Sequence, residues 1–166
     1  MAELPQHVAR AHPAVLTAIF VVGGIAQVVL SGASLPPLAR GLLTALPIAA
    51  TCLWCWSVFF VAKASSTTSP PPSWTWLFAV PPIIPIIAVL ADWSMNNSPV
   101  SLAFFIVFFV VLWFAAQALE NADALTDHAP AGRITVTMFF MFFALLGVWI
   151  LWPKIRRVEA RRASAS

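Results

Sequence analysis

Five apolar runs, separated by short polar segments, dominate the pattern of hydrophobic and polar positions along the chain. None of the five contains Asp, Glu, Lys, Arg or His. Each is close to the roughly 20 residues that an α-helix needs to cross a bilayer. The pattern therefore predicts an all-α integral membrane protein with about five transmembrane helices in one polytopic domain, residues 1–166. The predicted spans are roughly 13–31, 41–62, 74–91, 99–119 and 134–152.

Composition and the positions of tryptophan support this setting. The chain is 61% hydrophobic and 9% charged, whereas a soluble domain has about 25% charged residues. Trp74 and Trp93 lie at the ends of the third run, and Trp149 and Trp152 close the fifth. Indole rings favour the headgroup level, where the apolar ring meets lipid and the N–H meets water. We therefore expect a lipid bilayer around the chain, in a bacterial-type inner (plasma) membrane.

A basic tail, residues 153–166, follows the fifth run and holds five of the nine Lys and Arg residues. Cations next to a span favour the cytoplasmic side and attract anionic lipid headgroups. We expect both for this tail, and no binding of nucleic acid. Five spans with the N-terminus outside place six cations inside and three outside, since Arg40 then joins the tail. This count predicts a cytoplasmic C-terminus.

The third run suggests an alternative arrangement, because Pro81, Pro82 and Pro85 interrupt it. Proline removes a backbone donor and bends or breaks a helix. Four spans plus one re-entrant or proline-broken segment would place both termini inside, with seven cations inside and two outside. Against this, irregular backbone that faces lipid is costly. A signal peptide cleaved near residues 31–33 is a further alternative, but it would leave the basic tail outside.

The runs give little support to catalysis. Proton pumps and ion exchangers place ionisable residues inside the bilayer, and no such residue lies in these runs. We expect no catalytic residues and no cofactor. Cys52 and Cys55 have the spacing of a redox motif, but they lie in mid-span and the chain has no other cysteine to pass electrons on. We interpret both as small packing residues.

Phenylalanines recur at helical spacing in the fourth and fifth runs. Such stripes usually pack against other helices or face lipid, and we favour that interpretation over a groove for a quinone, pigment or lipid tail. The residues that share a face are Phe104, Phe105, Phe108 and Phe109 in one run, and Phe139, Phe143 and Leu146 in the other.

The segment 114–128, FAAQALENADALTDH, holds three of the six acidic residues of the chain and one of its three histidines. At 100° per residue, its polar residues gather on one side of a helix that would continue the fourth span and end near Pro130. This side is a candidate surface for docking a partner. Its residues are Gln117, Glu120, Asn121, Asp127 and His128.

The acids of this segment lie near the C-terminal end of the predicted helix, where the helix dipole favours cations. Arg133, a metal ion or a basic partner could offset them. Both arrangements of the spans place the segment on the membrane face opposite the basic tail. Carboxylates with imidazoles can bind zinc, but no short ligand spacing supports a metal site, so we expect none. The weak candidates are His12, Glu120, Asp123, Asp127 and His128.

The sequence thus predicts a small multi-spanning membrane protein that is most simply a non-catalytic accessory or assembly subunit of a larger membrane complex. A membrane-protein partner or a homo-oligomer would accompany this role. A small carrier or channel that uses the proline-broken third helix is the alternative. A lipid- or quinone-handling enzyme is less favoured.

Overall fold

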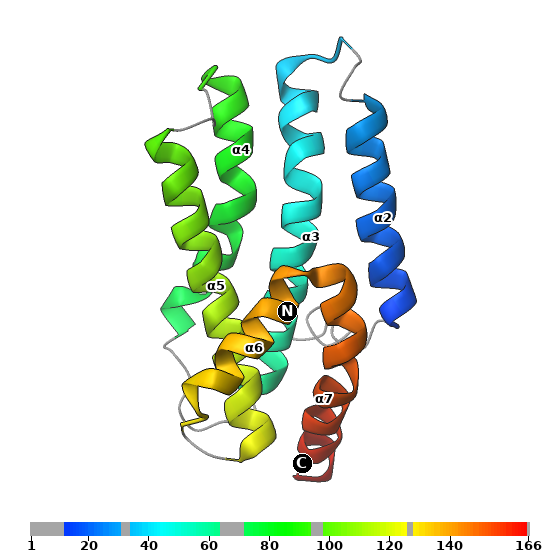
Figure 1. The fold of residues 1–166 in the computed structure, drawn as a ribbon, viewed down its shortest axis with the longest axis vertical. Coiled ribbons are helices and arrows are strands. Elements are labelled where there is room, and N and C mark those ends of the chain that lie inside the picture. The colour runs from blue at the N-terminus through cyan, green and yellow to red at the C-terminus, as the bar shows by residue number, and fades with distance from the viewer. Residues whose placement is uncertain (1–11, 31–33, 64–71, 94–97, 126–127, 166) are drawn as a thin grey trace.

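The computed structural model describes residues 12–30, 34–63, 72–93, 98–125 and 128–165 (Figure 1). Within these ranges every regular element is a helix. Three helices are long and apolar enough to cross a membrane: α2 (Pro13–Leu30), α3 (Pro37–Lys63) and α5 (Pro99–Ala124). The predicted all-α membrane fold is confirmed to this extent.

The third apolar run forms two helical pieces in succession. Residues Pro72–Ala79 are a 3₁₀-helix, η1, and Val80–Leu90 form α4. Pro81 and Pro82 occupy the first turn of α4, where a missing N–H leaves no helical hydrogen bond unmade. The run is therefore interrupted near its prolines, but it does not turn back: η1 and α4 follow one another along α3 (Figure 1).

The core lies where α3 meets α5 and α7. Trp54, Leu112 and Leu119 are among its most deeply buried side chains. The phenylalanines of α5 divide between packing and exposure, since Phe108 is buried whereas Phe105 is exposed. Phe109 stacks on Phe142 of the next helix with ring centroids 5.5 Å apart. Packing and outward exposure therefore account for the α5 stripe.

The fifth apolar run is not one continuous helix. It is divided between α6 (Ala131–Phe142) and α7 (Ala144–Ala165), which meet at Phe143. The chain reverses there, and the two helices return side by side (Figure 1). A Cβ atom placed on Gly147 of α7 would lie only 1.8 Å from the carbonyl oxygen of Phe140 in α6, so the two backbones touch at this point. We call α6 and α7 the hairpin.

The hairpin changes the predicted arrangement of the spans. Arg133, before the run, and Lys154, after it, both reach the same carboxylate, Glu120. A straight membrane-crossing helix would hold these two residues some 30 Å apart. The five predicted spans are therefore not confirmed, because the run 134–152 leaves one end of the bundle and returns to it. The tip of the hairpin stops near the middle of the molecule (Figure 1).

The prediction that the polar segment and the basic tail lie on opposite membrane faces is wrong. The basic tail is the outer part of α7, and it packs directly on the end of α5. The prediction assumed one straight helix over residues 134–152, whereas the reversal at Phe143 returns the basic tail to the end of α5. The signal-peptide alternative depends on residues 31–33, which lie outside the described residues.

Candidate functional site

Glu120 is the centre of the most polar region that the structure describes. It lies in the last turns of α5, and its side chain is 1% exposed. One carboxylate oxygen, Oε1, accepts hydrogen bonds from the hydroxyl of Thr137 in α6 and the ammonium of Lys154 in α7. The other oxygen, Oε2, has no hydrogen bond of good geometry within the described residues, but it lies 3.1 Å from Nη2 of Arg133. A single buried carboxylate thus joins three helices.

Asp123, one helical turn further on, extends these contacts. Its Oδ2 lies 3.5 Å from Nη2 of Arg133 and 3.8 Å from Nζ of Lys154. Its Oδ1 lies 3.9 Å from Nη2 of Arg157. Its backbone oxygen accepts a hydrogen bond of 2.9 Å from Arg161. We call Glu120, Asp123, Arg133, Lys154 and Arg157 the charge cluster.

The charge cluster explains how acidic residues are tolerated at the C-terminal end of α5. Carboxylates in the last turns of a helix face the negative end of its dipole and are unfavourable there unless cations lie near. Arg133 supplies one cation, as the sequence suggested, and α7 supplies Lys154 and Arg157. An unpaired charge in the position of Glu120 would destabilise the fold strongly, because the side chain is buried. The three cations provide the pairing that offsets this cost.

The turn after α5 directs the chain toward α6. Leu125, at the C-terminus of α5, has a positive φ of 52°, which ends the helix. The helix therefore stops at Ala124, before the predicted boundary near Pro130. Asn121 Oδ1 accepts a hydrogen bond of 2.9 Å from the backbone N–H of Ala129 and so holds the returning chain against α5. This contact positions Arg133 beside the carboxylates.

The predicted docking residues are only partly brought together on an open surface. Glu120 and Asn121 are buried and contact other parts of the same chain. Gln117 is half-buried and His128 is exposed. Asp127 lies outside the described residues. A docking role for this face stays a prediction, and its accessible described part is reduced to Gln117 and His128.

Of the weak metal candidates, Glu120 and Asp123 lie together in the charge cluster. His12, at the start of α2, lies against Trp149 of α7 with ring centroids 6.0 Å apart, away from the charge cluster. Within the described residues, no group of at least three His, Cys, Asp or Glu side chains could hold a metal ion. Glu120 and Asp123 use their oxygens for cations of the chain itself.

A pocket of about 390 Å³ opens between the arms of the hairpin, beside the charge cluster. Arg133, Lys154 and Arg157 line one part of it, and Val136, Phe140 and Ile150 line the part nearer the hairpin tip. Glu120 also contributes to its wall. The pocket is therefore cationic at one end and apolar at the other. We call it the hairpin pocket.

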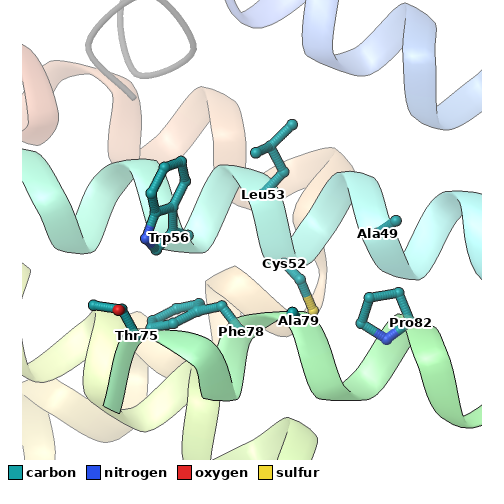
Figure 2. Close-up of a pocket in the computed structure, with 8 residues that line it drawn as sticks. All are labelled: Ala49, Cys52, Leu53, Trp56, Thr75, Phe78, Ala79 and Pro82. Carbon is teal, nitrogen blue, oxygen red and sulfur yellow. The ribbon is translucent and has the colours of Figure 1, made fainter. Parts of the chain in front are cut away.

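A second cavity, of about 430 Å³, lies between α3 and the interrupted third run (Figure 2). Apolar side chains form most of its wall, among them Trp56, Phe78 and Pro82. Figure 2 shows the sulfur of Cys52 pointing from α3 toward the opposite helix. Cys52 and Cys55 are both buried and are free thiols, which fits small packing side chains.

No known protein-family model, curated protein or solved structure matches this chain. The site is therefore interpreted from its own residues. Sequence reasoning missed Thr137, Lys154 and Arg157 as partners of the acids. The one available signal was charge: cations flank the fifth run on both sides, at Arg133 and Lys154, as they would if both ends faced the same acidic segment.

Proposed function

We propose that this chain is a non-catalytic accessory or assembly subunit of a larger membrane complex. The observation that carries the proposal is that the acids at the end of α5 form structural contacts between helices. Glu120 and Asp123 are paired with cations from α6 and α7, so their contacts join helices. A catalytic carboxylate needs an oxygen that is free to act on a substrate, whereas the oxygens of Glu120 face Thr137, Lys154 and Arg133 of the chain itself. The polar segment thus serves as a scaffold that fixes the hairpin.

The distribution of cations supports a cytoplasmic position for the hairpin. Figure 1 places the C-terminal ends of α3, α5 and α7 toward one end of the bundle and the start of α3 at the other. Arg40 belongs to the far end. Cations near spans favour the cytoplasmic side, so we place the hairpin there, in an inner (plasma) membrane. The described cations at the hairpin end are Lys63, Arg133, Lys154, Arg156, Arg157 and Arg161.

Labelling of single cysteines tests this arrangement. In a background with Cys52→Ala and Cys55→Ala, we expect Ala131→Cys and Arg161→Cys to react with an impermeant maleimide from the cytoplasmic side only. Arg40→Cys should react from the opposite side. Ala131 and Arg161 lie on either side of the reversal at Phe143, so a straight fifth span would expose them on opposite faces. That result would contradict the hairpin in the membrane.

Purification tests the subunit role. We expect the tagged chain, extracted from its native membrane in a mild detergent, to retain another membrane protein at a fixed ratio. An unrelated tagged membrane protein of similar size, extracted in parallel, should not retain it. Recovery of the chain as a lone monomer, confirmed by cross-linking in intact membranes before extraction, would overturn the proposal. Recovery of a homo-oligomer would indicate that the chain assembles with copies of itself instead of with another protein.

The carrier alternative has one supporting observation, the cavity beside the proline-interrupted third run. Interrupted membrane helices often border substrate paths. However, the described wall of this cavity carries no charged side chain, so it suits apolar solutes and not ions. Flux of an apolar solute into liposomes that contain only this chain would favour the carrier over the subunit.

A further inference from the structure

We propose that the hairpin pocket binds one anionic phospholipid, with its phosphate at Arg133 and Arg157 and an acyl chain along Val136 and Phe140. The pocket combines a cationic end with an apolar end inside one cavity of about 390 Å³. It requires the membrane setting, but it does not depend on a protein partner. It therefore goes beyond the subunit role.

The charge balance of the pocket favours an anion. Its described wall contains three cations, Arg133, Lys154 and Arg157, against the single carboxylate of Glu120. Adding the neighbouring Asp123 still leaves a net charge of +1, from three cations and two carboxylates. Positive charge confined in a cavity with apolar walls attracts anions more strongly than charge spread over an open surface.

The two arginines keep donors available for such an anion. Arg157 approaches Asp123 only to 3.9 Å, too far for a hydrogen bond. Arg133 uses a single nitrogen, Nη2, for its contacts with the acids: it donates a hydrogen bond of 3.5 Å to Asp123 and lies 3.1 Å from Oε2 of Glu120. Their side chains are 60% and 49% exposed. A guanidinium group has five N–H donors in a planar fork that matches phosphate oxygens, so most of these donors remain for a headgroup.

The positions of cationic and apolar side chains along the hairpin favour a lipid over a free anion as the ligand. The cations lie farther along α6 and α7 from the reversal at Phe143 than Phe140 and Ile150 do. A free phosphate would leave that apolar end empty. A phospholipid places its phosphate at the membrane surface and its acyl chains inward. Both parts of the pocket are then filled.

Lipid retention measured by native mass spectrometry tests the assignment. The purified full chain is exposed to phosphatidylglycerol or phosphatidylcholine of equal chain length. We expect retention of one phosphatidylglycerol and little phosphatidylcholine. Arg157→Gln should lower that retention roughly tenfold, the effect of losing about 1.4 kcal/mol of charge-assisted hydrogen bonding. Val136→Trp, which keeps every cation but fills the apolar end, should also lower retention.

Arg156→Gln is the matched control. Arg156 is the neighbour of Arg157 and is similarly exposed, but it pairs with Glu159 and lies over the Trp152 ring instead of lining the pocket. We expect the Arg156→Gln variant to retain phosphatidylglycerol within about twofold of the level of the unmodified chain, because the charge that it removes lies outside the pocket. Equal losses in Arg156→Gln and Arg157→Gln would indicate diffuse attraction and overturn the site.

Two further outcomes would also overturn it. Equal retention of the two lipids would exclude recognition of the anionic headgroup. Displacement by inorganic phosphate, with no effect of Val136→Trp, would identify a free-anion site instead. A lone monomer that retained phosphatidylglycerol in the pocket would refute the subunit role and leave the lipid site standing, so the two proposals fail separately.

Discussion

Glu120→Ala is expected to destabilise the protein by about 3–5 kcal/mol, the usual cost of removing one partner from a buried ion pair. The variant leaves Lys154, whose side chain is 17% exposed, without its closest carboxylate. It also removes the acceptor for the hydroxyl of Thr137. Thermal unfolding in mild detergent, followed by tryptophan fluorescence and size exclusion, measures the loss. Hydrogen exchange should show the strongest loss of protection in α6 and α7.

A double variant distinguishes the effect of losing the charge from the effect of losing the packing. The double variant Glu120→Leu with Lys154→Met removes both members of the closest pair and fills the space with apolar atoms. Replacing a whole buried pair in this way is often neutral, so we expect the double variant to be more stable than Glu120→Ala. Arg156→Gln breaks a more exposed pair and should cost about 1 kcal/mol or less. Equal stability of Glu120→Ala and Arg156→Gln would show that the charge cluster does not hold the hairpin.

Gly147→Ala is expected to force the two arms of the hairpin apart. The added Cβ would lie 1.8 Å from the carbonyl oxygen of Phe140 and 2.6 Å from its carbonyl carbon. Both are backbone atoms, so no change of side-chain rotamer can relieve the clash. Overpacking costs typically about 1–3 kcal/mol and more when backbone must move, and we expect the upper part of that range or beyond. The same unfolding measurement detects it.

Two other glycines provide a graded control. Gly24 of α2 has no atom within 4 Å of its would-be Cβ, so Gly24→Ala should be neutral or stabilise by up to about 1 kcal/mol through helix propensity. Gly41 of α3 would place a Cβ 3.3 Å from Cα of Ile86 in α4, which predicts an intermediate loss. A Gly147→Ala variant as stable as Gly24→Ala would contradict the close approach of α6 and α7.

The long helices could be predicted from the sequence because hydropathy reports directly on transfer into lipid. Runs such as 13–31 and 99–119 are strongly apolar and contain no charged residue, and their boundaries agree with α2 and, at its start, α5. The end of α5 was harder, because Leu125 adopts a positive φ that an apolar side chain seldom takes. No turn residue in the sequence marked that position.

The hairpin could not be predicted from the same signal. Hydropathy is identical for one straight helix and for two shorter helices that fold back on each other. What distinguishes them here is a contact between Lys154 and Glu120, 34 residues apart in the chain, and the close approach at Gly147. Such long-range pairings leave no local periodicity. The cation that the sequence did identify, Arg133, is the nearest in sequence to the acids.

The reversal at Phe143 also bears on how residues 131–165 can enter the membrane. A straight fifth span would require one flank of the run, either Arg133 or the basic tail, to be translocated against the usual preference of cations for the cytoplasm. With the hairpin end on the cytoplasmic side, as proposed above, neither flank has to be translocated, and only the apolar tip has to partition into lipid. In that arrangement, residues 131–165 can join the other helices from one side of the membrane.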